Sequence, residues 1–490
     1  MVTDKLIIDF DVGCEINAEI VSVRRDLIIT RRNKMAATKR LVALCILLLH
    51  AGAMAQRRLG AFREVFAWKQ MTFDIDGDAI VEDRYGDTSS SSGGPLFNYQ
   101  SSGGMFDQGP MMMGQGFDDV TTTVRPADER GRFFIQYNNV PMGVERVGDR
   151  LLVALPRRRY GIPATLNYID LNTESNKRSP ALKPYPDFKR SRNLTSVYRT
   201  RADDCGRLWM VDTGLLEIPG APQQVQTPAI VIYDLSTDQQ ILRYPFKSSD
   251  TPAANTPTGL ASITVDTSEG CANAFAYVPD LTTFGLIVFS LRDNDSWRLT
   301  HNFFHLSPTA GNLRIAGQNF QWSDGIFSLT LTEEGRDGCR TAYFHPLISI
   351  EEFSVSTCVL KNRTASQDSR FWTMFSKVGD RGEDSQCTMH GYHAGTHVVF
   401  FAEIGRDSVS CWNTGRVLRP SNVAILAQDR QAMSYPSDLH VTGDEVWVMA
   451  NTLPRFGYSR LDVNEYNFFV YRGNVRELIT GTVCDNGFNR

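Results

Sequence analysis

Several common site patterns are missing from this sequence of 490 residues: C-x-x-C, G-x-S-x-G, H-E-x-x-H and the P-loop pattern G-x-x-x-x-G-K-[ST]. Their absence argues against a zinc ribbon, an α/β-hydrolase nucleophile elbow, a zinc peptidase and a P-loop nucleotide enzyme. Long apolar runs are also scarce. The run Leu41–Leu49 is too short to cross a bilayer, because a spanning helix needs about 20 residues.

An excess of positive charge is absent too. The chain has 51 Lys and Arg against 55 Asp and Glu, a formal net charge of −4. Such a balance disfavours nucleic acid or an anionic membrane as the main partner. The run of three basic residues, Arg157–Arg159, precedes Tyr160-Gly161, and we interpret it as a solvated loop.

The N-terminal region has the pattern of a targeting sequence. Lys39 and Arg40, the apolar run Leu41–Leu49 and the Ala53-Met54-Ala55 site are typical of a secretory signal peptide, which predicts a secreted protein whose mature chain begins at Gln56. We assign 35–55 to the signal. The stretch 1–34 ahead of it has no clear pattern, and we interpret it as a gene-model extension that starts before the true first residue, Met35.

A repeated group of strands follows. Six units each contain a strongly apolar strand, whose anchor residues lie 57, 67, 51, 72 and 48 residues apart. The anchors are Leu151, Leu208, Phe275, Ile326, Val398 and Val446. Periods near 40–50 residues with several strands per unit are typical of propeller blades. We therefore predict an all-β fold, a six-bladed β-propeller over 129–490, and we take the anchored strands as the innermost ones.

Two segments precede the predicted propeller. Arg63–Phe73 alternates like a strand, and the last unit is short of strands, so we expect 56–86 to supply an N-terminal strand that closes the ring. Residues 87–128 are rich in Ser, Gly, Met and Gln, which predicts a low-complexity, flexible insertion.

Secretion favours paired cysteines and glycans. Seven cysteines lie beyond the signal, and Cys339 and Cys358 sit symmetrically about a turn, so a cross-strand bridge between them is geometrically feasible. Three N-x-[ST] sequons, at Asn193, Asn294 and Asn362, fall at expected loops or strand ends and are candidate glycosylation sites.

Several long motifs in order carry a family resemblance. They are "CGRLWMVDTG", "QWSDGIFSLTL", "TAYFHPLISIEEFSVST", "SCWNT", "YPSDLHVTGDEVWVMANTLPRF" and "GTVCDN". The chain resembles the yellow/major royal jelly protein family of insects over about Phe62–Ile80 and Phe133–Asn486. The resemblance implies a secreted six-bladed propeller linked to cuticle pigmentation, dopachrome conversion or the binding of small aromatic amines. It also implies the disulfides Cys205–Cys271 and Cys411–Cys484, which leaves Cys387 unassigned.

Ligands of propellers bind where strand ends converge near the axis. Polar residues beside the expected inner strands are therefore our candidate ligand-binding residues, with turn capping as the simpler alternative for each. They are Asn139, Asp212, Asp324, Asp438 and Asn451.

One three-histidine motif and the single residue His345 are further candidates. His390-x-x-His393-x-x-x-His397 has zinc-like residues, but Gly391 and Gly395 interrupt it, so we predict a surface loop and no metal. His345 precedes Pro346 at a strand end, where it caps a turn or serves as a base.

Two functions remain open at this point. The chain either binds a small aromatic amine or catechol-derived metabolite without converting it, or isomerises dopachrome in melanin formation with Asp212, Asp438 or His345 as base. No cofactor is expected for either function, and the oligomeric state stays open. A calcium-dependent lactonase is a third, less favoured reading, because other six-bladed propellers hold a divalent ion on the axis.

Overall fold

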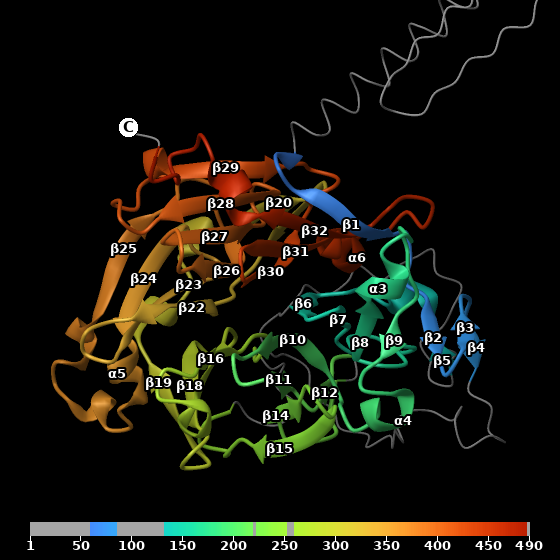
Figure 1. The fold of residues 1–490 in the computed structure, drawn as a ribbon, viewed down its shortest axis with the longest axis horizontal. Coiled ribbons are helices and arrows are strands. Elements are labelled where there is room, and N and C mark those ends of the chain that lie inside the picture. The colour runs from blue at the N-terminus through green and yellow to red at the C-terminus, as the bar shows by residue number, and fades with distance from the viewer. Residues whose placement is uncertain (1–58, 86–131, 219–221, 252–258, 488–490) are drawn as a thin grey trace, which may run out of the picture. The chain divides into compact units, whose positions relative to one another are not determined.

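The computed structural model describes residues 59–85, 132–218, 222–251 and 259–487 (Figure 1). The chain divides into two units, Met1–Arg57 and Arg58–Arg490, and the fold described here is that of the second. The predicted extension 1–34, the predicted signal 35–55 and the predicted insertion 87–128 lie outside the described residues.

Six four-stranded antiparallel sheets form the blades of a β-propeller, as predicted (Figure 1). Blade 1 contains β6 (Gly143–Val147), β7 (Arg150–Ala154), β8 (Leu166–Asp170) and β9 (Lys183–Pro184). Blade 2 contains β10 (Val197–Ala202), β11 (Arg207–Asp212), β14 (Ala229–Asp234) and β15 (Gln239–Pro245). Blade 3 contains β16 (Thr264–Asp266), β17 (Phe275–Asp280), β18 (Gly285–Ser290) and β19 (Asp295–Thr300).

Blades 4 to 6 continue this order around the ring. Blade 4 contains β22 (Ile326–Glu334), β23 (Arg340–Pro346), β24 (Glu351–Ser356) and β25 (Phe375–Asp380). Blade 5 contains β26 (Cys387–His393), β27 (Val398–Glu403), β28 (Ser408–Asn413) and β29 (Val423–Gln428). Blade 6 contains β30 (Pro436–Thr442), β31 (Glu445–Asn451), β32 (Phe468–Asn474) and, as its outer strand, β1 (Arg63–Trp68).

The N-terminal strand closes the ring. β1 pairs antiparallel with β32, so a segment from the start of the fold completes the blade formed by its end. Phe66 and Trp68 of β1 are fully buried, and the indole N–H of Trp68 donates to the carbonyl of Pro180 (2.8 Å). Closure removes the open strand edge that a ring of blades would otherwise leave.

The strands predicted as innermost are second in their blades, with one exception. β7, β11, β17, β27 and β31 each lie between two partners, and only the anchor Ile326 belongs to a first strand, β22. The second strands are the most apolar because both of their faces pack against neighbouring blades. The first strands border the axis and carry polar groups such as Glu145, Arg199 and His440, which weakened their strand pattern.

Short elements decorate the ring. Four two-stranded sheets pair β2 (Phe73–Ile75) with β3 (Asp78–Ile80), β4 (Arg84–Tyr85) with β5 (Arg132–Phe134), β12 (Leu215–Leu216) with β13 (Gln223–Gln224), and β20 (Asn312–Ile315) with β21 (Gln318–Gln321). The α-helices in the described residues are α3 (Leu171–Glu174), α4 (Phe188–Ser191), α5 (Thr357–Lys361), α6 (Leu453–Tyr458) and α7 (Val475–Ile479). Within the described ranges, no helix is long and apolar enough to cross a membrane.

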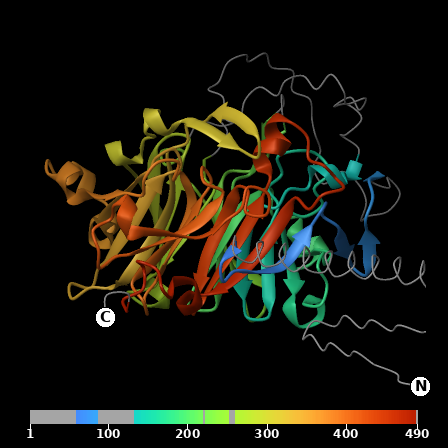
Figure 2. The ribbon, with the colours of Figure 1, turned by 90° about the horizontal axis from the view of Figure 1, so that it is seen from above.

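The β20–β21 hairpin and α6 lie at the same edge of the ring (Figure 2). The first strand of each blade begins at this end, and the second strand returns to it. We call this end the hairpin face.

Candidate functional site

All five predicted ligand-binding residues lie toward the hairpin face, at or near the start of a first strand or the end of a second one. Their side chains differ in what they contact. Asp212 ends β11, is fully buried, and accepts hydrogen bonds from the backbone N–H groups of Thr195 and Ser196. Its carboxylate also pairs with Arg243 at 2.9 Å. Asp212 therefore fixes the segment that enters β10.

Asn139 and Asn451 hold the loop that enters blade 1. The amide of Asn139 donates to the carbonyls of Ile135 (2.7 Å) and Gly161 (3.0 Å). The amide of Asn451 donates to the carbonyl of Pro141 (2.7 Å), which joins the end of blade 6 to this loop. Both residues are buried, and their role in binding a ligand stays a prediction.

Asp438 belongs to a buried group of charges on the first strands around the axis. It accepts from the backbone N–H of Val144 (2.8 Å) and lies 3.5 Å from Arg199 and 3.2 Å from Nε2 of His440. Nδ1 of His440 lies 2.9 Å from Glu145. Burial lowers the pKa of His440, but the carboxylates of Asp438 and Glu145 outweigh it and raise that pKa to about 9.

This charge group bears on the lactonase reading. Its carboxylates face cationic side chains, whereas calcium requires six to eight oxygen ligands with free negative charge. The arrangement disfavours an axial calcium ion at Asp438 and Glu145.

Asp324 differs from the other four candidates. It lies two residues before β22, is half-buried, and its carboxyl group has no hydrogen bond or ion pair within the described part of the chain. Burial raises the pKa of Asp324 to about 7, although the charge of Arg158 opposes this shift. An unpaired carboxyl group with a pKa near neutrality is suited to general base catalysis.

Aromatic rings form a wall beside Asp324. Trp322 packs edge-on against Tyr435, with ring centroids 5.8 Å apart, and its indole N–H donates to the hydroxyl of Tyr458 (2.7 Å). Phe320 of β21 stacks on Tyr458 of α6 at 4.8 Å. We call Phe320, Trp322, Tyr435 and Tyr458 the aromatic wall. The hairpin and α6 therefore meet through these rings.

Tyr435 has an unusual backbone conformation. Its φ is +48°, a left-handed value that is costly for a bulky residue and that recurs at functional sites. Burial raises the pKa of Tyr435, and the negative charge of Asp324 raises it further, so the hydroxyl stays protonated at neutral pH. Among the described residues this hydroxyl has no hydrogen-bond partner.

The basic run Arg157–Arg159 is not the solvated loop that we predicted. Arg157 is buried and donates to four carbonyl groups, including those of Leu194 (2.7 Å) and Thr195 (2.6 Å). Arg158 pairs with Glu217 at 3.5 Å, and Arg159 lies over the ring of Phe456 at 4.3 Å. The turn is folded onto the hairpin face, because carbonyls and aromatic rings there replace water around the guanidinium groups.

A second cluster lies buried between blades 4 and 5. Nδ1 of His345 is 3.0 Å from Glu352, and Nε2 of His390 is 3.1 Å from the other oxygen of the same carboxylate. Arg381 also pairs with Glu352, at 2.7 Å. Despite the cost of burial, the imidazoles lower the pKa of Glu352, while burial lowers the pKa of His345 to about 4.

The cluster of His345, Glu352 and His390 has the ligand types of a metal site. It fits a divalent ion poorly, because Arg381 already neutralises the carboxylate and would lie close to the ion. Its hydrogen bonds instead join four strands. The hydroxyl of Ser328 in β22 lies 2.7 Å from Nδ1 of His390 in β26, and His345 in β23 contacts Glu352 in β24.

Our prediction of a surface loop for the histidine motif His390/His393/His397 is wrong. His390 and His393 belong to β26 and are buried, and the three imidazoles have different partners. His393 contacts Asp444 (3.2 Å), whereas His397 contacts Glu333 (3.1 Å). Gly391 permits this strand because a Cβ there would meet Val441 of blade 6 at 2.8 Å.

Three disulfides join six of the seven cysteines that lie in the described residues. They are Cys205–Cys271, Cys339–Cys358 and Cys411–Cys484, and Cys387 is a buried free thiol. The three sequon residues Asn193, Asn294 and Asn362 are exposed, which a glycan requires; their modification stays a prediction.

The sequence comparisons with known proteins all indicate the same family. The family model described as "Major royal jelly protein" matches residues 195–484. "L-dopachrome tautomerase yellow-f" of Drosophila melanogaster is 43% identical over 360 residues, which cover 72% of this chain and 83% of that protein. "Protein yellow" of Drosophila subobscura is 38% identical over 361 residues, covering 72% of this chain and 62% of that protein.

Solved structures are more distant. A PQQ-bound aldose sugar dehydrogenase from Streptomyces coelicolor aligns over 68% of this chain and 94% of its own, with 9% identity and a TM-score of 0.36. A likeness at that level carries no argument about function.

Proposed function

Because this chain belongs to the yellow/major royal jelly protein family, we propose that it is a secreted protein of pigment formation that isomerises a dopachrome-like aminochrome. One observation carries the proposal: the unpaired carboxyl group of Asp324 lies at the hairpin face beside the aromatic wall. The name of the relative yellow-f, an L-dopachrome tautomerase, supports the reaction class.

The reaction moves protons and needs no oxidant or reductant. A base removes a proton from a saturated ring carbon, the electron pair of that C–H bond enters the ring system, and a quinone oxygen gains a proton. Two such transfers, one from each saturated ring carbon, give a dihydroxyindole in which both quinone oxygens have become phenols. In our proposal Asp324 is the base, and its pKa near 7 leaves it partly ionised at neutral pH.

Tyr435 is suited to the opposite end of the substrate. Its hydroxyl stays protonated and has no partner in the described residues, so it can donate to a quinone oxygen as negative charge develops there. The rings of Trp322 and Tyr458 can pack against a flat bicyclic substrate. The proposed catalytic residues are therefore Asp324 and Tyr435.

The five ligand-binding predictions enter this proposal with different roles. Asp324 contacts the substrate. The other four residues support the strands and loops at the hairpin face through the bonds described above; they are Asn139, Asp212, Asp438 and Asn451. The alternative is a protein that binds an aromatic amine on the same wall without converting it.

The test measures the rate of dopachrome loss with purified protein against a heat-denatured control. We expect Asp324→Asn to lower kcat by about 10²–10⁴-fold, the usual contribution of a general base, and Tyr435→Phe to lower it as well. Glu383→Gln, a variant of an exposed carboxylate in the loop before β26, should keep the wild-type rate. The kcat should rise with pH through about 7, because only the ionised form of Asp324 accepts a proton.

The melting temperature separates catalysis from folding. Ionised Asp324 lacks a partner and its raised pKa costs stability above pH 4, so Asp324→Asn should melt at the same temperature as the wild type or higher. Full activity of Asp324→Asn would refute the assignment. Saturable binding of dopamine with no catalysed loss of dopachrome would favour the amine-binding alternative.

A further inference from the structure

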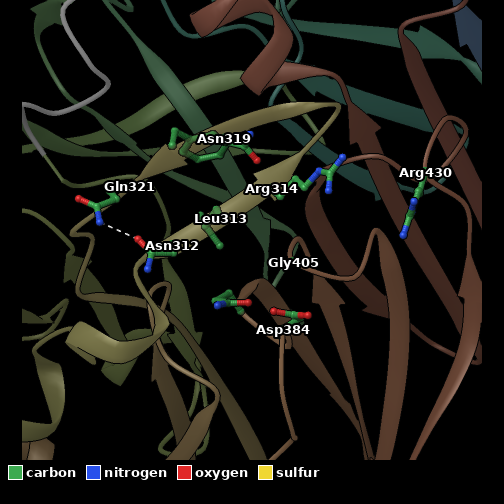
Figure 3. Close-up of a pocket in the computed structure, with 10 residues that line it drawn as sticks. Asn312, Leu313, Arg314, Asn319, Gln321, Asp384, Gly405 and Arg430 are labelled. Carbon is green, nitrogen blue, oxygen red and sulfur yellow. Dashed lines mark hydrogen bonds between the residues drawn. The ribbon is translucent and has the colours of Figure 1, made fainter.

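A separate cavity of about 590 Å³ opens on the hairpin face between the β20–β21 hairpin and the loops of blade 5 (Figure 3). The hairpin contributes Arg314 and Phe320, the loop before β26 contributes Asp384 and Gln386, and Gly405 and Arg430 complete this side. In Figure 3, Arg314 and Arg430 lie on one side of the cavity, while Asp384 and Gly405 lie below the hairpin. The volume suits a small metabolite.

Gln386 lines this cavity and has a buried, unsatisfied acceptor. The residue is 4% exposed, its Nε2 donates to the carbonyl of Ala310 (2.8 Å), and its Oε1 has no hydrogen-bond partner in the described part of the chain. The bond to Ala310 identifies Oε1 as the free atom. A buried acceptor without a partner is costly and rare, so this oxygen indicates a donor group that a ligand supplies.

The chain leaves room for this amide. A Cβ atom at Gly405 would lie 2.3 Å from Oε1 of Gln386 and 2.4 Å from the carbonyl oxygen of Asp384. The backbone N–H of Ile404 donates to the carbonyl of Gln386 (2.8 Å), which fixes the residue from the other side. The position of the amide is therefore set before any ligand arrives.

Charged groups around the cavity are also unpaired. Arg314, Arg430 and Asp384 are exposed, and none of them has an ion pair or a side-chain hydrogen bond among the described residues. Water solvates these groups in the free protein. Two guanidinium groups and one carboxylate around one cavity match a ligand that carries both charges.

We propose that this cavity binds an aromatic α-amino acid in its zwitterionic form. The carboxylate of the ligand pairs with Arg314 and Arg430, and its ammonium group donates to Oε1 of Gln386 and to Asp384. The aromatic side chain packs against Phe320, whose other contacts are with Trp322 and Tyr458 of the aromatic wall. The site is additional to the proposed catalytic site; the two share the ring of Phe320, but the binding of the amino acid does not depend on Asp324 or Tyr435.

Calorimetric titration of the full-length protein with L-phenylalanine tests the proposal. Phenethylamine lacks the carboxylate and 3-phenylpropionate lacks the ammonium group, so each should bind at least tenfold more weakly than L-phenylalanine. Arg314→Gln and Arg430→Gln should each weaken L-phenylalanine binding at least tenfold. Gln386→Met should do the same, because it removes the acceptor and keeps the volume.

Controls keep this result independent of the catalytic assignment. Asp324→Asn should bind L-phenylalanine like the wild type, and the exposed positions of Arg314 and Arg430 make their variants safe for folding. Absence of saturable L-phenylalanine binding to the wild type would overturn the proposal. Equal affinity for either single-charge analogue would overturn the zwitterion as the ligand class.

Discussion

Asp324 and Asp438 are carboxylates at the same end of the ring with opposite surroundings. Asp438 is fully buried but accepts from a backbone N–H and faces Arg199 and His440, so its charge is compensated. Asp324 retains contact with solvent but has no comparable partner among the described residues, and its pKa rises to about 7. Partners, more than burial, decide which carboxylate is available for chemistry.

The sequence could identify both residues but could not tell them apart. Each stands near the start of a strand, and a turn cap looks the same there in either case. The partners of Asp438 come from positions as distant as Val144 and Arg199, and no local pattern reports such contacts. Tyr435 was visible only as part of a motif, because its positive φ and its free hydroxyl are properties of the fold.

His440 gives a pH test at the level of single residues. Both imidazole nitrogens of His440 face carboxylates, and these carboxylates raise the pKa of His440 to about 9. Arg201, 3.0 Å from Nδ1, is a nearby cation. A histidine whose pKa is raised in the folded state contributes its full stabilisation below about pH 6.5, and this contribution is lost as the pH rises through about 9.

We expect the free energy of unfolding of the wild type to exceed that of His440→Gln at pH 6.5. This difference should shrink by about 3 kcal/mol between pH 6.5 and pH 10, the equivalent of the pKa shift. Urea unfolding of both proteins at the two pH values measures it. A difference that stays constant with pH would show that His440 is not charged in the folded protein.

At the level of elements, second strands were easier to predict than first strands. The second strands β17 and β27 and the third strand β18 are buried along their whole length and are largely apolar in sequence. β26 and β30 contain His, Ser, Thr and Asp, because their side chains meet one another around the axis. The strands that build the site were therefore the ones that hydrophobic pattern alone could not find.

β1 completes blade 6, so we expect substitutions in its buried residues to lower the stability of the closed ring. Phe66 is fully buried in the main apolar cluster, with its ring 5.7 Å from that of Trp68. Phe66→Ala should lower the free energy of unfolding by about 3–5 kcal/mol, the usual cost of removing a buried phenylalanine ring. Chemical denaturation followed by tryptophan fluorescence measures this loss.

A substitution in the same strand provides the control. Glu64 is exposed and pairs with Arg178 at the surface, so Glu64→Gln should cost at most about 1 kcal/mol. If Phe66→Ala were no more costly than Glu64→Gln, β1 would be an accessory strand and the closure of blade 6 would rest on β32.

At the scale of the molecule, the ring is stabilised at its chain ends by covalent and non-covalent links. β1 joins the first described segment to blade 6, and Cys411–Cys484 joins β28 of blade 5 to the segment after α7. The amide of Asn413 also donates to the carbonyl of Cys484 (3.0 Å). The resemblance implied this disulfide, and the fold confirms that it joins blade 5 to the C-terminal tail.

The two disulfides Cys411–Cys484 and Cys339–Cys358 allow a comparison of loop lengths within one protein. Their sequence separations are 73 and 19 residues. In the chain-entropy model, the longer loop stabilises the fold by about 4 kcal/mol and the shorter by about 3 kcal/mol, because a longer closed loop removes more freedom from the unfolded chain. We expect the double variant Cys411→Ser/Cys484→Ser to unfold at a lower urea concentration than Cys339→Ser/Cys358→Ser. Equal midpoints would contradict the loop-length argument, and a larger loss for the shorter loop would place the main contribution in local packing at β23 and α5 instead of in the tail.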